Sequence, residues 1–272
     1  LLYNRAVLLM TMDLERFQHA ISLRDSGKLE EAASELRSMV EESPNAPAIE
    51  RGLLWINEEA CLVQLGRFEE ARHSWGMANE LLKECAEVRL LVEYDDACLC
   101  MSERKPEDAF RKFKSMLTRH AEVLKTPEES GYYREIQLRH GLLLVELKRY
   151  REARPIMEEV LALDVEKDGA FYFSLGICYL ALHEKDLARQ QFCEALRLGL
   201  PDEKLVDSHF YLGVAYFRMR AYAKALQEFE FCEANIRKST LPLRGLYKWL
   251  ALTCRNLDLR EEAKRYFVLS KV

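Results

Sequence analysis

The sequence predicts an all-α fold in which antiparallel helix pairs stack on one another. The 272-residue chain contains only 11 glycines and 7 prolines, and short polar breaks separate its apolar segments, which favours helices joined by tight turns. Hydrophobic residues make up 49% of the chain, enough for an extended core. A pattern of small and large residues also recurs at intervals of about 38 residues, which indicates a structural repeat.

An alanine that follows each polar break anchors the repeat. Seven stretches end on it: DSGKLEEA, QLGRFEEA, SERKPEDA, ELKRYREA, ALHEKDLA, RMRAYAKA and NLDLREEA. Their last residues, at successive intervals of 39, 38, 44, 35, 37 and 38, are Ala32, Ala71, Ala109, Ala153, Ala188, Ala225 and Ala263. The common register predicts one helix pair for each alanine, seven in all.

Two further columns keep this register. Four residues after each alanine stands a large apolar side chain: Leu36, Trp75, Phe113, Met157, Phe192, Phe229 and Phe267. Twelve residues before it, six of the seven units have a small residue: Ala20, Ala97, Gly141, Gly176, Gly213 and Ala251. Paired helices approach to about 8–10 Å only where small side chains permit it, and a helical glycine costs about 1 kcal/mol relative to alanine. We therefore expect close packing within each pair.

Glu59 is the exception in the small-residue column. Burying an unpaired carboxylate is costly, and Ala60 stands beside it. The favoured interpretation is therefore a local shift that gives Ala60 the small-residue place and turns Glu59 aside. The alternative is a buried acid bonded to a partner that the sequence does not identify.

The predicted array occupies residues 13–272, behind an N-terminal flanking or cap segment at 1–12. Its approximate units are 13–51, 52–89, 90–133, 134–168, 169–205, 206–243 and 244–272. The longest interval falls around residues 119–135. It predicts either an extended second helix or a loop insertion between the third and fourth units, where a hinge could form.

Three segments resemble the tetratricopeptide repeat family, whose pattern runs W-x2-L-G-x2-Y, then A-x3-F, then P. They are residues 172–195, which begin YFSLGICY, residues 209–229, which begin HFYLGVAY, and residues 247–267, which begin YKWLALTC. The resemblance covers about residues 13–272 and implies a right-handed α-solenoid, the superhelix of this family. The intervals exceed the family's usual 34 residues, so we expect longer helices or turns.

The resemblance also implies where a partner would bind. In this family the first helix of each pair lines a concave groove that takes a peptide or a helix of another protein. Carried over to this sequence, the candidate groove residues are Tyr94, Leu138, Arg139, Phe173, Ile177, Phe210, Tyr211, Arg218, Lys248, Trp249 and Arg255. Aromatic and basic side chains suit a segment with apolar anchors and carboxylates. The carboxylate clamp of chaperone-binding members is not matched, because Phe17 and Ile21 stand where it needs Lys and Asn.

Composition and motifs argue against several other function classes. The 40 basic and 45 acidic residues are interleaved and give a net charge of −5, which does not favour a nucleic-acid partner. The longest apolar run is too short to span a membrane. Six dispersed histidines without HExxH, G-x-S-x-G or a Gly-rich phosphate loop predict a non-catalytic protein without a metal or cofactor. Eight cysteines without a CxxC pair predict free thiols and a cytoplasmic location.

A peptide-binding adaptor is the favoured function. The alternative is an assembly module that self-associates or docks through its solenoid ends. Leu259, Phe267 and Leu269 would leave an apolar face after the seventh pair, and a homo-oligomer formed through the C-terminal end would cover it. A third hypothesis, a ligand-sensing regulatory domain, requires an enclosed pocket.

Overall fold

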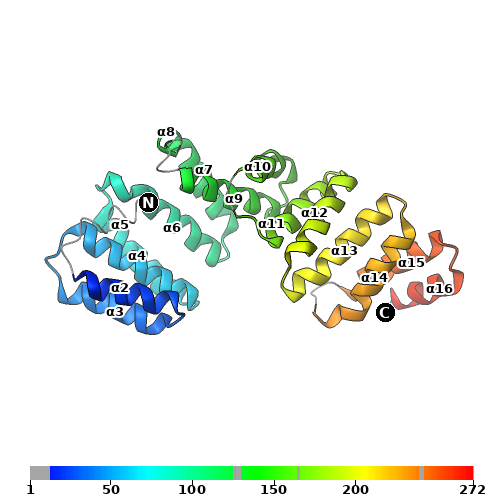
Figure 1. The fold of residues 1–272 in the computed structure, drawn as a ribbon, viewed down its shortest axis with the longest axis horizontal. Helices are drawn as coiled ribbons and strands as arrows, with labels where there is room; N and C mark the ends of the chain where they lie inside the picture. The colour runs from blue at the N-terminus through cyan, green and yellow to red at the C-terminus, as the bar shows by residue number, and fades with distance from the viewer. Residues whose placement is uncertain (1–12, 125, 127–129, 164–165, 239–241, 272) are drawn as a thin grey trace. The chain divides into compact units, whose positions relative to one another are not determined.

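The computed structural model describes residues 13–124, 126, 130–163, 166–238 and 242–271. Within these residues all regular secondary structure is helical, which confirms the predicted all-α class (Figure 1). The helices are α2 (Leu14–Asp25), α3 (Leu29–Glu42), α4 (Ala48–Gln64), α5 (Phe68–Leu82), α6 (Ala86–Ser102), α7 (Pro106–Arg119), α8 (Ala121–Leu124), α9 (Ser130–Glu146), α10 (Tyr150–Ala162), α11 (Gly169–Ala181), α12 (Lys185–Leu198), α13 (Asp202–Arg218), α14 (Tyr222–Asn235), η1 (Ile236–Lys238), α15 (Leu243–Asn256) and α16 (Arg260–Leu269). The predicted flanking segment at 1–12 lies outside the described residues.

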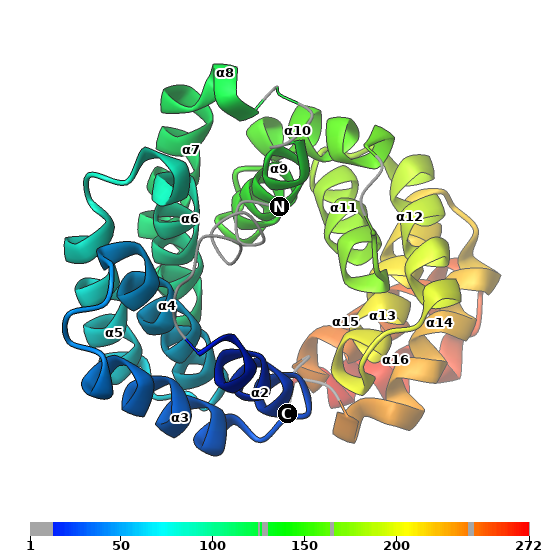
Figure 2. The same cartoon turned by 60° about the vertical axis from the view of Figure 1, so that its left-hand side comes forward.

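The chain folds as two compact units, Leu1–Leu143 and Leu144–Val272. In the first unit the pairs α2–α3, α4–α5 and α6–α7 follow one another, and the second helix of one pair packs on the first helix of the next. The second unit repeats this arrangement in the pairs α11–α12, α13–α14 and α15–α16 (Figure 2). The predicted stacking of helix pairs is confirmed within each unit.

The turn within each pair has one recurring conformation. Seven residues with positive φ, between 57° and 82°, follow one another at the intervals of the anchoring alanines: Gly27, Gly66, Arg104, Lys148, His183, Arg220 and Asp258. The next residue then donates its N–H to the carbonyl five positions back, as Ala221 does to Tyr216 at 2.9 Å. This is the Schellman motif, which satisfies the last carbonyls of a helix and reverses the chain tightly.

The small-residue column brings paired helices together as predicted. A Cβ atom built on Gly176 would lie 2.7 Å from the ring of Phe192, and one built on Gly213 would lie 2.7 Å from the ring of Phe229. Both phenylalanine side chains are fully buried, whereas Phe267, at the same position of the last pair, is 55% exposed. The glycines therefore make room for the rings.

The favoured interpretation of Glu59 is wrong. Glu59 is only 5% exposed, and it is Ala60 that lies half-exposed. Burial, reinforced by the charge of Asp95, raises the pKa of Glu59 to about 9. Desolvation also raises the pKa of Asp95 to about 7, and its Oδ2 atom has no hydrogen-bond partner within the described part of the chain. Helix α4 thus keeps its register and buries a carboxyl group that is neutral at pH 7.

The long interval contains a short extra helix. Helix α7 ends at Arg119, and α8 occupies Ala121–Leu124 before α9 begins at Ser130. Leu124 is 1% exposed and belongs to the core formed by α6, α7 and α9. The insertion is therefore packed onto the first unit at Leu124 rather than forming a simple extension of α7.

Candidate functional site

An open groove of about 750 Å³ runs between α15 and α16 in the second unit. Its apolar floor is formed by Ala251, Leu252, Ala263 and Phe267. Its basic rim is formed by Arg244, Lys248, Arg255, Arg260, Lys264 and Lys271, and Asp258 and Ser270 complete the lining. An apolar floor with a mostly basic rim can bury an apolar surface of a ligand and favour a ligand that also carries negative charge.

The periodicity of α15 gives the groove its character. Leu246, Leu250 and Cys254 recur every four residues and are buried, so they form the face that packs on the preceding pair. Lys248, Leu252 and Arg255 fall on the opposite side and line the groove. The amphipathic helix thus buries one face and leaves a mixed apolar and cationic face open.

The cations on the rim differ in what they contact. Arg244 donates to the carbonyl oxygen of Ser270 at 3.1 Å, and two others form ion pairs, Arg260 with Asp258 at 3.0 Å and Lys264 with Glu261 at 2.9 Å. The Lys271 ammonium lies 4.5 Å from the ring centroid of Phe267.

Lys248 and Arg255 are exposed like the other cations of the rim, but they differ from them in their contacts. Neither forms a hydrogen bond or an ion pair with another residue in the described ranges. Their charges are available to a ligand.

The structure divides the sequence-predicted groove residues. Lys248 and Arg255 come together in the α15–α16 groove. Trp249 points to the other side of α15, where its ring centroid lies 5.2 Å from that of Phe217 and 6.1 Å from that of Phe229. Trp249 therefore joins neighbouring helix pairs, and its direct contact with a partner stays a prediction.

The remaining candidates of the second unit are half-buried or bonded within the chain. Tyr211 contacts the rings of Phe173 and Phe192 at 6.0 and 6.1 Å, and Phe210 contacts Phe229 at 5.8 Å. Arg218 donates to the carbonyl oxygen of Leu180 at 2.7 Å. Ile177, another candidate, is half-buried. Their part in binding stays a prediction.

Three candidates lie in the first unit. Arg139 donates to the Tyr94 hydroxyl at 2.7 Å and pairs with Glu135 at 2.8 Å. Burial raises the pKa of Tyr94 well above its ordinary value, so the hydroxyl stays protonated. Leu138, next to Arg139 in α9, is half-buried. Arg139 is thus held by its own chain.

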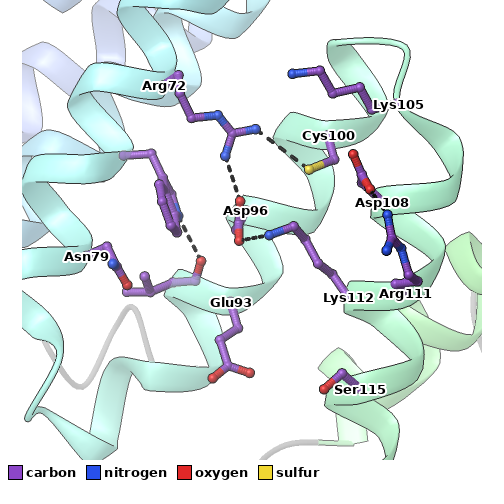
Figure 3. A network of polar contacts seen from close by, with 12 residues as sticks. Arg72, Asn79, Glu93, Asp96, Cys100, Lys105, Asp108, Arg111, Lys112 and Ser115 are labelled. Atoms are coloured by element: carbon purple, nitrogen blue, oxygen red, sulfur yellow. Dashed lines mark hydrogen bonds and ion pairs between the residues drawn. The ribbon is translucent and has the colours of Figure 1, made fainter.

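A network of charged residues on α5, α6 and α7 is the second polar cluster of interest (Figure 3). Arg72 donates to Asp96 at 2.6 Å and to Glu103 at 2.9 Å, and its guanidinium lies 3.7 Å from the Cys100 sulfur. Lys112 pairs with the second oxygen of Asp96. Because the charges neutralise one another, this network ties the helices together and offers little free charge to a ligand.

Four cations of the groove are not among the sequence-predicted residues: Arg244, Arg260, Lys264 and Lys271. A signal was present, because the last 30 residues place basic side chains three or four positions apart on both helices of the final pair. Only the pairing of α15 with α16 shows that they surround one apolar floor. No described helix combines the length and the apolar character that a membrane crossing requires.

Comparison with known proteins identifies the repeat. The family model described as "Tetratricopeptide repeat" matches residues 138–203. A search of curated proteins gives no match. A tetratricopeptide repeat protein from Parabacteroides merdae has a similar structure, with a TM-score of 0.57 at 18% identity over 94% of this chain and 91% of that one.

Two further solved structures share the fold. The C-terminal part of a TPR repeat-containing protein from Cytophaga hutchinsonii has a TM-score of 0.60 at 13% identity, over 93% of both chains. PilF of Pseudomonas aeruginosa has a TM-score of 0.57 at 18% identity, over 82% of this chain and 92% of that one. Residues 138–203 thus carry the tetratricopeptide repeat, and the chain as a whole has the fold of tetratricopeptide repeat proteins.

Proposed function

We propose that the chain is a non-catalytic protein-interaction scaffold that binds a peptide or helical segment of a partner protein in the α15–α16 groove. The observation that supports this most is the apolar floor of the groove beside Lys248 and Arg255, two exposed cations with no bonded partner in the described ranges. Apolar surface that is rimmed by charge and open to solvent marks interaction sites on proteins of this size. Tetratricopeptide repeats generally serve as such scaffolds.

This proposal shifts the predicted binding surface toward the C-terminal pair. Lys248 and Arg255, which the sequence analysis predicted as part of a groove lined by first helices, also belong to the surface proposed here. The rings of Phe173, Tyr211 and Trp249 contact neighbouring helix pairs, so substituting them would disturb packing as well as any ligand contact. The α15–α16 groove is the place where binding and folding can be tested separately.

The cysteines support a reducing, cytoplasmic compartment for this function. All eight are free, and five of them are buried: Cys61, Cys100, Cys178, Cys232 and Cys254. Free thiols in this number are typical of proteins that work where disulfides do not persist.

Selection from a random peptide library tests the proposal. Peptides of about 20 residues, about 30 Å long as helices, are selected on the wild-type chain and then rebound to Lys248→Glu/Arg255→Glu. We expect the variant, confirmed folded by circular dichroism, to bind at least about tenfold more weakly. The charge-matched control Lys204→Glu, at an exposed position of α13, should bind like wild type. The proposal would be contradicted if every selected peptide bound equally well to the wild-type chain and to Lys248→Glu/Arg255→Glu.

A second candidate function is self-association through the C-terminal face. Leu259, Phe267 and Val268 are 37, 55 and 61% exposed, and a second copy of the chain could cover them. Light scattering over a range of protein concentrations separates the two functions. A dimer that Phe267→Ser dissociates would support assembly, whereas a monomer at high concentration would leave the groove for another protein.

A further inference from the structure

The inner helix pairs show what kind of segment fits a groove of this repeat. Helix α13 packs on the α11–α12 pair, and α15 packs on the α13–α14 pair. In the first groove Tyr211 stacks on Phe192 with ring centroids 6.1 Å apart, and in the second Trp249 stacks on Phe229 at the same separation. Each groove thus takes an α-helix whose aromatic side chain lies against the phenylalanine of the second helix.

The last groove presents the same phenylalanine without a helix on it. Phe267 follows Phe229 by 38 residues, as Phe229 follows Phe192 by 37. Phe192 and Phe229 are fully buried, but Phe267 is 55% exposed. The Lys271 ammonium, 4.5 Å from the ring centroid, is the group that lies over it. An incoming aromatic ring can take this place and release Lys271 to bind a carboxylate.

The charge of the last groove differs from that of the inner ones. Three residues before the small residue of the first helix, the inner pairs have Phe173 and Phe210, whereas the last pair has Lys248. Four residues after it, Leu180 and Phe217 give way to Arg255 in the last pair. In the inner grooves Phe173 contacts Tyr211, and Phe217 contacts Trp249.

Lys248 and Arg255 therefore stand where the inner grooves touch the occupying helix. A cation at each of these positions calls for a carboxylate on the occupant, because a charge-assisted hydrogen bond is roughly twice as strong as a neutral one. An apolar helix of the kind that fills the inner grooves would leave both charges unpaired.

We propose that the α15–α16 groove binds an acidic amphipathic helix of a partner protein. Its aromatic side chain stacks on Phe267, and its carboxylates pair with Lys248 and Arg255. The proposal rests on the proposed function and names the class of partner. It differs from a simple apolar contact in that the charge on the flanks of the helix, not only its apolar stripe, decides binding.

Three synthetic peptides of about 20 residues test the charge selection, a length that spans about 30 Å as a helix. All share one length and one helix propensity. The first has an apolar stripe with a central Trp flanked by Glu, the second has the same stripe flanked by Lys, and the third keeps the Glu flanks but has Ala throughout the stripe. Fluorescence anisotropy measures their binding to the wild-type chain at low and at physiological salt.

We expect the first peptide to bind at least about tenfold more tightly than either of the others, with an affinity that falls as salt rises. Lys248→Glu/Arg255→Glu should reverse the preference in favour of the Lys-flanked peptide. Phe267→Ser should weaken the first peptide without changing the order. Lys248→Met/Arg255→Met removes both charges but keeps unbranched apolar side chains, and it should abolish the preference, which keeps the test decisive if the doubly acidic variant unfolds.

Different results would contradict the acidic helix and the docking groove. Equal binding of the Glu-flanked and Lys-flanked peptides would overturn the acidic helix but leave the docking groove of the proposed function intact. Binding by library-selected extended peptides alone would overturn the helix in the same way. Absence of all peptide binding, together with a dimer that Phe267→Ser dissociates, would overturn both and assign the groove to a second copy of the chain.

Discussion

Gly213 and Phe229 are packed so closely that a Cβ atom on the glycine would lie 2.7 Å from the phenylalanine ring. Phe229 also carries the ring of Trp249 at 6.1 Å, so it cannot move away without disturbing the next helix pair. One missing methyl group thus sets the spacing within the α13–α14 pair and between this pair and α15.

Gly213→Ala should destabilise the chain by about 1–3 kcal/mol, because the added methyl group overpacks a filled interface. Gly76→Ala is the matched control, since a Cβ atom there meets no other atom within 4 Å. Because Gly76 lies in the middle of α5, where alanine is favoured over glycine, this change should stabilise the folded chain by about 0.5–1 kcal/mol. Urea denaturation measures both, and equal effects of the two substitutions would contradict the role of close packing.

Arg220→Gly should raise the unfolding free energy by roughly 0.5–1 kcal/mol. Arg220 has a φ of 64°, a conformation that costs a residue with a Cβ atom about 1–2 kcal/mol and costs glycine almost nothing. Part of the stability gained by the substitution is lost because glycine has more backbone entropy in the unfolded chain. Gly66→Ala, at the corresponding turn with a φ of 74°, should have the opposite effect. Thermal unfolding distinguishes them, and a gain from both changes would refute the shared turn conformation.

Glu59→Gln should make stability less dependent on pH. The pKa of Glu59 is raised in the fold to about 9, by burial first and then by Asp95, against the stabilising charge of Arg72. Because the folded chain keeps a proton that the unfolded chain releases, the wild type should lose stability as pH rises from about 4.5 to about 9. Denaturation at pH 5, 7 and 9 should show a gain for Glu59→Gln that grows with pH.

Asp95 leaves a residual slope in both proteins, because its pKa is raised to about 7 by desolvation. The stability that Asp95 contributes also falls as pH rises, but this fall ends near pH 7, the pKa of Asp95 in the folded chain. Parallel curves for wild type and Glu59→Gln above that pH would show that Glu59 does not hold the proton.

Cys193 should react with iodoacetamide faster than the buried cysteines. It lies exposed on α12, whereas burial raises the pKa of Cys61 and Cys178 to about 11 and that of Cys232 to about 12. A buried thiol with a raised pKa offers neither access nor thiolate. Mass spectrometry over time should show Cys193 modified before the five buried cysteines in the native chain, and all eight modified after denaturation. Early loss of Cys232 would contradict the burial.

The repeat could be predicted from the sequence because its signal is local. Gly176, Gly213 and their phenylalanine partners lie 16 residues apart within one helix pair, so their spacing follows from helix geometry alone. Glu59 was misjudged for the opposite reason, since its cost of burial falls once the carboxyl group keeps its proton. The register of α4 then prevails over one unfavourable side chain.

The site could be predicted only in part. Lys248 and Trp249 are neighbours in sequence and both fit a first-helix binding surface, yet they point in different directions from α15, one to the groove and one to the rings of Phe217 and Phe229. Which of two adjacent side chains meets the preceding pair depends on how α15 is rotated against it. The apolar periodicity of α15 indicates which face is buried, but the exact rotation that places Trp249 on the preceding pair is set by tertiary packing.

The open side of the last pair has a kinetic consequence. Helix α14 is covered by α15, whereas α16 packs mainly on α15 and reaches α14 through the hydrogen bond from Tyr266 to Glu233. The amide hydrogens of α16 should therefore exchange with solvent through brief local openings, whereas those of α14 should require larger ones. A helix bound in the groove would slow exchange in α16 far more than elsewhere. Hydrogen exchange would then report occupancy on the unmodified chain, with α14 as its internal reference.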